Sequence, residues 1–509
     1  MAPADSSKPL WERYPVTLTN SLGGGKEAFQ PSIQGFVGMY VCGPTVYNHV
    51  HLGNVRTFLT FDIVSRYFRH LGYRVRYVRN ITDVGHLEND ADEGEDKIAK
   101  KARLERLEPM EVVKNYTDGF HHVMRQFNIL PPSIEPTATG HILEQIEITR
   151  KLIEEGIAYE VNGSVYFSVR TYNQKHPYGI LSGRNIEELM ESGRDLDAQD
   201  EKREKMDFAL WKKASPAHIM RWNSPWGEGF PGWHIECTVM STRYLGETFD
   251  IHGGGMDLKF PHHECEIAQA TAANGKAPVR YWLHSNMLTV NGQKMSKSLG
   301  NSFLPAELFS GNHPLLTRGY TPMTVRFFML QSHYSSTLDF SNEALIGAEK
   351  GYRRLANALA LLKNMQVSAG GEGADARLSA ELDKLSDDCY LNMSDDFNTA
   401  KTLAVLFEMS SRINDMHNGI IKPSAVSPAV FRRFAETYIG FMEDVLGFLT
   451  EEEGGGALLD GAVQVLIGLR KKAKEDRNYS LSDKIRDDLK AAGIQLKDGK
   501  DGSMTWEPV

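Results

Sequence analysis

The sequence has few cysteines, no long apolar run and no excess of positive charge, and each absence excludes a class of protein. Only four cysteines occur among 509 residues, widely spaced, which argues against a disulfide framework and is typical of reduced thiols or metal ligands. No apolar run approaches the ~20 residues that a membrane-spanning helix needs. The first residues also lack the apolar stretch of a secretory signal, so we expect a cytoplasmic protein with no membrane partner.

The net charge of -9 gives no general signature of nucleic-acid binding, so any contact with a phosphate backbone has to come from local basic faces. The sequence also contains no tandem repeat that would indicate a solenoid. A hydrophobic content of 41% and a charged content of 24% are typical of a soluble globular protein. The length predicts two to four domains.

The first part of the chain predicts a parallel α/β sheet. Residues 36–46 read as a buried strand that ends at Gly43 and Pro44, residues 55–70 have helical spacing, and residues 73–80 read as a second strand. This strand–helix–strand order requires a right-handed crossover between parallel strands. We therefore expect the ligand at the carboxyl ends of the strands.

The later part of the chain is almost purely helical, with apolar residues three and four apart over 343–363, 378–392 and 399–417. Gly-rich acidic breaks at 369–373 and 451–456 read as linkers or exposed loops. The predicted domains are a Rossmann-like parallel-sheet domain over 1–341 with an insertion at about 110–205, a helical bundle over 342–450, and a small C-terminal module over 457–509.

Two polar segments outside these elements have plainer interpretations. The acidic insertion after Thr82, which includes residues 85–96, is most simply a solvated loop, because its carboxylates lack the spacing of an EF-hand. Lysines and arginines gather within 470–490, but aspartates and glutamates lie between them, so this stretch reads as a solvated helix face.

Two short motifs are suited to binding phosphate. His49, His51 and Gly53 lie where the first strand leads into the first helix, and free backbone N–H groups at such a helix start favour anions. The second motif is KMSKS at 294–298, whose lysines Lys294 and Lys297 suit a loop that closes over a polyphosphate. Taken alone, KMSKS is equally compatible with a solvated surface loop.

A third segment, HGGGMD at 252–257, combines three glycines with one carboxylate. The glycines allow close approach of a ligand, and Asp257 can accept hydrogen bonds from a ribose. The alternative is a flexible turn.

Four residues predict a metal site. His262 and Glu266 are four apart in a run of helical character and so share one face, while Cys42 and Cys237 can supply two thiolates. Zn²⁺ accepts sulfur, imidazole and carboxylate ligands. The alternative is two buried cysteines and an unrelated helix.

Three neighbouring residues are weaker ligand candidates. His263 has Ile267 at the four-residue spacing, which makes it a poorer ligand than His262. Cys265 is an additional candidate three residues after His262, and Cys389, within a predicted helix, is structural.

With these motifs in this order, the sequence resembles the class I aminoacyl-tRNA synthetases, and the cysteinyl-tRNA synthetases in particular. The matching segments are 39–48 (MYVCGPTVYN), 51–54 (HLGN), 80–83 (NITD), 207–212 (DFALWK), 231–237 (PGWHIEC), 252–258 (HGGGMDL) and 260–264 (FPHHE). The resemblance is strong from about residue 16 to 345 and continues more loosely through 395–400, 482–486 and Trp506.

The resemblance implies an ATP-dependent ligase that forms cysteinyl adenylate from L-cysteine and transfers it to tRNA(Cys), releasing AMP and pyrophosphate. It implies one Zn²⁺ per chain, Mg²⁺ accompanying ATP, a tRNA-binding bundle, an anticodon-recognition module at the C-terminus and a monomer. The implied residues are Cys42, Cys237, His262 and Glu266 for zinc; Thr82 and Trp233 for the amino acid; His49, His51, Gly53, Asn54, Asp257 and Lys297 for ATP; and His51, Asn54, Lys294 and Lys297 for catalysis.

The sequence departs from the family pattern at several positions. Asn54 stands where the motif ends in His, although Asn can still donate to a phosphate or ribose oxygen. Cys265 stands where Asn is common, and the stretch after Tyr334 lacks the expected Arg and Pro. The acidic insertion replaces a shorter loop.

Two other functions fit part of the pattern. One is the related ligase that joins activated cysteine to an amino sugar in mycothiol synthesis, which shares the zinc and ATP signatures; the helical domain and C-terminal module argue against it. The other is a non-catalytic RNA-binding paralogue, which the intact 294–298 loop and the four metal-ligand candidates disfavour.

Overall fold

The structure, a computed structural model, describes residues 8–85, 96–185, 201–216, 218–295, 299–365, 375–422, 425–449, 454–498 and 504–508. The chain divides into two compact units, Met1–Phe448 and Leu449–Val509. Lys297, most of the acidic insertion and the break at 369–373 lie outside the described residues. The break at 451–456 is shorter than expected, since a helix begins at Gly454.

A four-stranded parallel sheet lies at the centre of the first unit. Its strands are β3 (Phe36–Val41), β4 (Arg74–Arg79), β10 (Phe249–Gly255) and β11 (Val279–Ser285), in the order β11-β10-β3-β4. β10 is buried along its whole length, as expected of a strand covered on both faces. Gly253 pairs with Val41, so the carboxyl ends of β3 and β10 lie side by side. The predicted α/β fold with a parallel sheet is confirmed.

Helix α2 (Leu52–His70) connects β3 with β4. It begins three residues before the expected start at Val55, because the side chain of His51 caps it there. β3 ends at Val41, just before the expected end at Gly43 and Pro44, and Pro44 has no N–H to donate to a sheet.

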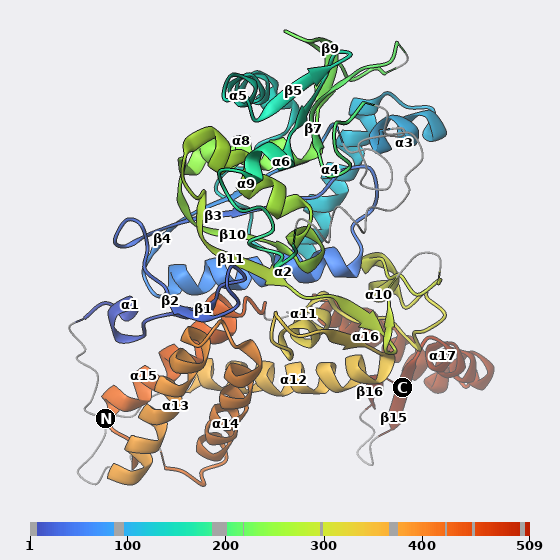
Figure 1. Cartoon of the computed structure of the whole chain (residues 1–509). Helices are drawn as coiled ribbons and strands as arrows, with labels where there is room; N and C mark the ends of the chain where they lie inside the picture. The colour runs from blue at the N-terminus through green and yellow to red at the C-terminus, as the bar shows by residue number, and fades with distance from the viewer. Residues whose placement is uncertain are drawn as a thin grey trace. The chain divides into compact units, whose positions relative to one another are not determined.

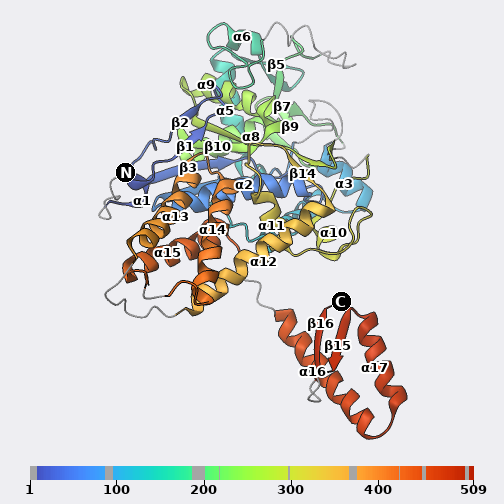
Figure 2. The same ribbon diagram turned by 90° about the horizontal axis from the view of Figure 1, so that it is seen from below.

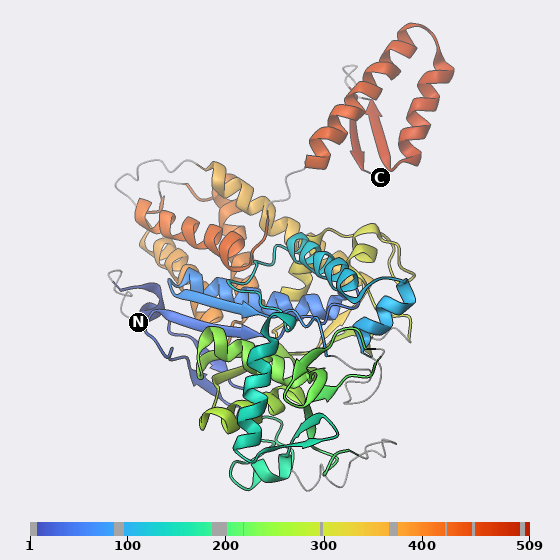
Figure 3. The same ribbon diagram turned by 90° about the horizontal axis from the view of Figure 1, so that it is seen from above.

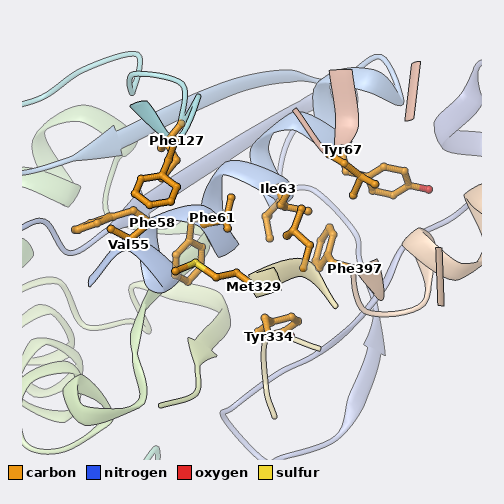
Figure 4. Packing of buried hydrophobic residues seen from close by; sticks show 14 of the residues in the cluster. Val55, Phe58, Phe61, Ile63, Tyr67, Phe127, Met329, Tyr334 and Phe397 are labelled. Carbon is orange, nitrogen blue, oxygen red and sulfur yellow. The ribbon is translucent and has the colours of Figure 1, made fainter. Parts of the chain in front are cut away.

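The apolar core of the first unit is packed along α2. Figure 4 shows that residues of this helix meet side chains that are distant in the sequence. The labelled residues are Val55, Phe58, Phe61, Ile63 and Tyr67 of α2, with Phe127, Met329, Tyr334 and Phe397 from other segments. The helix that carries the first phosphate-binding motif is therefore held rigidly by packing on several sides.

A separate antiparallel sheet combines two strands of the predicted insertion at about 110–205 with three strands that follow it. Its strands are β5 (Ala158–Val161), β6 (Ser164–Phe167), β7 (Phe208–Lys213), β9 (Gly227–Pro231) and β8 (Trp222–Ser224), in that order. Helices α5 (Ile142–Glu154), α8 (Trp233–Leu245) and α9 (His262–Asn274) pack beside it around a core of their own. Figures 1 and 3 show α2 and the parallel strands between this green region and the orange helices.

Those orange helices form the bundle, which consists of α12 (Asn342–Asn364), α13 (Ala376–Ser394), α14 (Thr399–His417), α15 (Pro428–Gly440) and a π-helical turn, Phe441–Val445. Ser341 caps α12, and α14 has the bounds expected from its apolar spacing. The bundle belongs to the same compact unit as the parallel sheet.

A buried ion cluster joins α2 to this bundle. Asp62 of α2 accepts hydrogen bonds from Arg66 at 2.9 Å and from Arg326 at 2.7 Å, and Arg326 belongs to helix α11 (Pro322–Leu330). Arg326 also donates to the carbonyls of Leu446, at 2.7 Å, and Phe127, at 2.6 Å. Charged groups therefore fix the end of the bundle to the middle of α2.

The remaining elements of the first unit are shorter. Three strands form a small sheet: β12 (Leu288–Val290), β13 (Gln293–Lys294) and β14 (Leu338–Phe340). The others are α1 (Leu10–Arg13), β1 (Thr17–Thr19), β2 (Lys26–Ala28), α3 (Lys97–Glu105), α4 (Pro109–Gln126), α6 (Val169–Asn173), α10 (Pro305–Ser310) and the 3₁₀ turns Thr139–His141 and Met256–Lys259.

The second unit consists of two helices and a hairpin. Helices α16 (Gly454–Glu475) and α17 (Tyr479–Ala491) lie beside strands β15 (Ile494–Asp498) and β16 (Met504–Pro508), as Figure 2 shows. Val463, Ile467, Leu489 and Ile494 form its buried core. In neither unit do the described residues include a helix with the length and hydropathy of a membrane span.

Candidate active site and metal centre

A cleft of about 510 Å³ opens at the carboxyl ends of β3 and β10. Six of the residues singled out in the sequence line it: Cys42, His49, His51, Asn54, Trp233 and Asp257. These residues come from four separate segments. The fold therefore brings the first phosphate-binding motif together with the thiol of Cys42, the indole of Trp233 and the carboxylate of Asp257.

The start of α2 is closed by a reciprocal capping box. The Asn54 backbone N–H donates to His51 Nδ1 at 3.3 Å, and the His51 N–H donates to Asn54 Oδ1 at 3.2 Å. Asn54 therefore replaces the usual histidine of the motif with a side chain that stabilises the helix start. The capping box uses only the oxygen of this amide, so its Nδ2 group can donate to a ligand.

The glycines of HGGGMD have a packing role. A Cβ added at Gly253 would lie 2.1 Å from the ring of Phe61 on α2, and one at Gly254 would lie 2.8 Å from His263. Larger residues would therefore push β10 away from α2 and α9. Asp257 follows in the 3₁₀ turn Met256–Lys259 and reaches the cleft.

The four predicted metal ligands form one buried cluster. Cys42 follows β3, Cys237 lies on α8, and His262 and Glu266 lie one turn apart on α9. The Cys42 and Cys237 sulfurs are 3.5 Å apart, Cys42 Sγ is 3.5 Å from Glu266 Oε1, and His262 Nε2 is 3.2 Å from the same oxygen. One donor atom of each residue lies within 4.8 Å of all the others.

This geometry passes a simple test for a tetrahedral metal ion. Ligands at roughly 2.0–2.3 Å from Zn²⁺ are themselves separated by about 3.3–3.8 Å. The three separations of 3.5, 3.5 and 3.2 Å are close to that range, and all six donor pairs lie within 4.8 Å. A donor set of two sulfurs, one imidazole and one carboxylate also suits this ion.

A second group of donors, which sequence reasoning missed, shares two of these residues. His252 Nε2 is 2.8 Å from Glu266 Oε2, and His263 Nε2 is 3.3 Å from Cys42 Sγ. Cys42, His252, His263 and Glu266 thus form an alternative set of four. His263 is better placed than its helical spacing suggests, because it meets Cys42 just after β3 and His284 of β11, at 2.8 Å, as well as Glu266 of its own helix at 4.0 Å.

Electrostatics within the cluster favour binding of a cation. Burial disfavours the Cys237 thiolate, but the Cys42 thiol and His262 stabilise it and lower its pKa to about 6. Burial also disfavours the Glu266 carboxylate, yet His252 and His262 lower its pKa to about 2. A metal ion here would meet two anionic ligands in a buried site, where charge interactions are strong.

His262 carries the compensating positive charge. Burial disfavours its imidazolium form, but hydrogen bonds to Cys237 and Glu266 raise its pKa to about 10. By contrast, burial raises the pKa of Cys42 well above its ordinary value and lowers that of His263. His262 must release its proton to bind a metal, so metal binding competes with this proton.

The predicted amino-acid contacts lie on either side of the cluster. The Trp233 ring is 4.4 Å from the ring of His262 and faces the cleft. Thr82 lies deeper: its hydroxyl donates to Glu236 Oε2 at 2.8 Å and accepts from the Asn80 amide at 3.1 Å. Thr82 is not among the residues that line the cleft.

The other two cysteines lie outside both donor groups. Cys265 is buried 3.5 Å from the Tyr178 hydroxyl, in the core beneath the antiparallel sheet. Cys389 is buried in the bundle, 3.6 Å from the sulfur of Met409. Neither thiol approaches the cluster closely enough to bind the same ion.

The second phosphate-binding motif begins in the small three-stranded sheet. Lys294 ends β13, is exposed, and its carbonyl accepts from the Asn301 amide at 3.2 Å. Met295 lines the cleft and lies within 3.2 Å of the position of a Cβ on Gly53. The two motifs are therefore adjacent in space.

Comparisons with known proteins agree with this arrangement. Residues 28–350 match the family model of the class I (C) tRNA synthetase catalytic domain, and residues 390–450 match that of the DALR domain. Among solved structures, methionyl-tRNA synthetase of Mycobacterium tuberculosis in complex with methionyl-adenylate is similar, with a TM-score of 0.55 and 15% identity over 81% of this chain and 89% of that one. At that identity the likeness concerns the fold alone.

Curated relatives are much more similar in sequence. The cysteine–tRNA ligase of Porphyromonas gingivalis is 55% identical over 493 residues, which are 96% of this chain and 99% of that protein. The cysteine–tRNA ligase of Cytophaga hutchinsonii is 55% identical over 492 residues, covering 96% and 98%. On this similarity, the chain belongs to the cysteine–tRNA ligase family of class I aminoacyl-tRNA synthetases.

Proposed function

We propose that this chain activates L-cysteine with ATP to form cysteinyl adenylate and transfers the cysteinyl group to tRNA(Cys), with release of AMP and pyrophosphate. The observation that carries the proposal is a buried donor cluster of two cysteines, one histidine and one glutamate that borders the same cleft as the start of α2. A thiol-binding site and a phosphate-binding site within one cleft suit a ligase whose substrates are cysteine and ATP.

The proposed cofactor is one Zn²⁺ per chain, held by Cys42, Cys237, His262 and Glu266. Bound there, Zn²⁺ would accept the thiolate of cysteine and discriminate against serine, whose hydroxyl ionises far less readily. Because Cys42 lines the cleft, the side chain of a bound cysteine can reach the cluster. Such chemical selection removes the need for an editing domain.

The remaining residues of the cleft have positioning roles. The positive end of the α2 dipole attracts phosphate, with His49, His51, Gly53 and Asn54 beside it. Asp257 accepts a hydrogen bond from the ribose, and Trp233 and Thr82 shape the space for the amino acid. Lys294 and Lys297 neutralise charge on the phosphates, and Mg²⁺ accompanies ATP.

The reaction itself is then an in-line displacement. The carboxylate of cysteine attacks the α-phosphorus of ATP, pyrophosphate leaves, and the terminal ribose hydroxyl of tRNA attacks the resulting mixed anhydride. No covalent enzyme nucleophile takes part, so catalysis depends on positioning and on charge stabilisation.

Different parts of the chain have different proposed roles. We assign adenylate formation to residues 1–341, tRNA binding to the bundle over 342–450, and anticodon recognition to the module over 457–509. The match of residues 390–450 to the DALR domain supports a distinct role for the bundle. We further propose a cytoplasmic enzyme that acts as a monomer.

The decisive experiment measures zinc content, cysteine-dependent exchange of pyrophosphate into ATP, and charging of tRNA(Cys) on one preparation. We expect about one Zn²⁺ per chain, exchange with cysteine but not with serine, and charged tRNA. Incorporation of cysteine only into an amino sugar, or zinc content without exchange, would contradict the proposal.

A further inference from the structure

The cleft contains one fixed cation to which the proposed mechanism assigns no role. Among the described residues that line it, Lys97 is the single lysine or arginine. Lys294 is exposed and does not line the cleft. A polyphosphate bound here would therefore meet the ammonium group of Lys97 as the nearest described cationic side chain of the wall.

Local structure holds Lys97 in place. It is the first residue of α3, which Asp96 caps by accepting a hydrogen bond from the Ala99 N–H at 2.8 Å. The next residue, Ile98, is fully buried, and so is Ala102 one turn later. With these two residues fixed in the core, the opposite face of the first turn points towards the cleft.

The ammonium group of Lys97 lies over the ring of Tyr47, which also lines the cleft. Lys97 Nζ lies 5.5 Å from the centroid of the Tyr47 ring, a cation–π contact. Tyr47 belongs to the segment that leads from β3 to the start of α2. Lys97 is thus next to the segment whose helix start attracts phosphate.

Within the proposed function, the thiol has the donor cluster, the ribose has Asp257, and the phosphates have the start of α2 with Lys294 and Lys297. Lys294 does not line the cleft, Lys297 lies outside the described residues, and the chain as a whole carries a net charge of -9. A local cation is needed to offset that unfavourable field. We propose that Lys97 is a substrate-contacting residue that binds the polyphosphate of ATP during adenylate formation, an inference that rests on the proposed function.

The test compares three variants of the full-length, zinc-loaded protein. Lys97→Met removes the charge and keeps much of the aliphatic length, Lys97→Arg keeps the charge, and Lys100→Met removes a charge from the same helix outside the cleft. For each protein, we would measure the KM for ATP, the KM for cysteine and kcat in pyrophosphate exchange, together with zinc content.

A charged hydrogen bond to phosphate is worth enough to lower kcat/KM for ATP by about 10- to 100-fold. We expect that loss in Lys97→Met with an unchanged KM for cysteine and unchanged zinc content, partial recovery in Lys97→Arg, and values within about twofold of the parent in Lys100→Met. Transfer to tRNA from preformed cysteinyl adenylate should keep its rate.

Other outcomes overturn the inference. If exchange is unchanged and only transfer to tRNA fails, Lys97 contacts RNA and not ATP. If Lys97→Met loses zinc or weakens cysteine and ATP equally, its role is structural. Absence of exchange in the parent protein would instead refute the proposed function, so the two failures are distinguishable.

Discussion

Cys237 occupies a central position among the cluster residues. Its sulfur is 3.5 Å from Cys42, its pKa is lowered to about 6, and it lies on a different helix from His262 and Glu266. It therefore combines a readily ionised thiol with a position between the sheet and α9. Replacing this one sulfur by oxygen changes the chemistry of the site with little change in shape.

We predict that Cys237→Ser reduces cysteine activation far more than ATP binding. A neutral hydroxyl is a poor zinc ligand, so kcat/KM for cysteine in pyrophosphate exchange should fall at least about 100-fold, while the Kd for ATP changes by less than about threefold. The matched control is Cys265→Ser, in which a buried thiol outside the donor groups is replaced. Equal loss of cysteine activation and ATP binding in Cys237→Ser would contradict zinc binding of the substrate thiolate.

For individual residues of the donor cluster, the sequence predicts contacts within one helix and misses contacts between separate segments. His262 and Glu266 are recognisable as partners because both lie on one helix at a four-residue spacing. His252 reaches Glu266 from β10, whose register with β3 pairs His252 with Tyr40, whereas His263 reaches Cys42 from α9. No local spacing encodes that register or the position of α9 against the end of β3, so these two contacts require the tertiary structure.

Helix α2 connects the cleft with the rest of the unit. Its first turn borders the cleft, and its middle holds the ion cluster of Asp62, Arg66 and Arg326. The side chains of all three are at most 7% exposed. A carboxylate between two guanidinium groups is stable only while every member is paired, so the cluster fixes the relative position of three segments.

We predict that Asp62→Asn destabilises the protein strongly. The change keeps the shape of the side chain but leaves two buried guanidinium groups without their counter-charge, which typically costs about 3–5 kcal/mol. Urea unfolding of the first unit should show a decrease of that size in the free energy of unfolding. Glu443→Gln breaks a partly exposed ion pair with Lys363 and should cost less than about 1 kcal/mol. A similar decrease in the free energy of unfolding for both variants would show that the buried ion cluster is no more important for stability than the partly exposed ion pair.

The bounds of elements follow from the sequence where a local signal sets them. The apolar spacing gives the bounds of α14, whereas α2 starts earlier than its apolar residues suggest because a cap of His51 and Asn54 adds a turn. The strands of the antiparallel sheet are three to six residues long, and β6 and β7 pair although residues 168–207 lie between them. Such short strands give little periodicity, so their pairing could not be predicted.

Each of the two compact units of the chain has its own apolar core. The first contains the whole cleft and the donor cluster, and the second contains no residue of either. The second unit can therefore be removed without removing any residue of the cleft or of the donor cluster.

We predict that a chain ending at Phe448 retains adenylate formation and loses efficient charging. Its cysteine-dependent pyrophosphate exchange should remain within about threefold of the full-length rate. Its kcat/KM for tRNA(Cys) should fall by at least about 100-fold, because a second tethered binding site contributes by its high effective concentration. Charging at the full rate by the truncated chain would show that the second unit does not contribute to tRNA recognition.

We also predict that removal of the metal lowers the stability of the first unit. The four donors join segments that are 195 and 224 residues apart in the chain, so an ion bound to them cross-links the folded state. Chelation should decrease the free energy of unfolding by about 3 kcal/mol or more, measured by urea unfolding with and without added Zn²⁺. An unchanged midpoint would show that the cluster does not hold an ion tightly.

The separation of the donors along the chain also sets the time at which the site can form during synthesis. After Cys42 has been synthesised, the ribosome adds 224 further residues before the chain includes Glu266. This takes roughly 10–45 s at about 5–20 residues per second. The bundle begins only at Asn342. The nascent chain thus holds all four donors of the cluster before any of its bundle helices exists, so a metal could be bound while the bundle and the C-terminal unit are still being made.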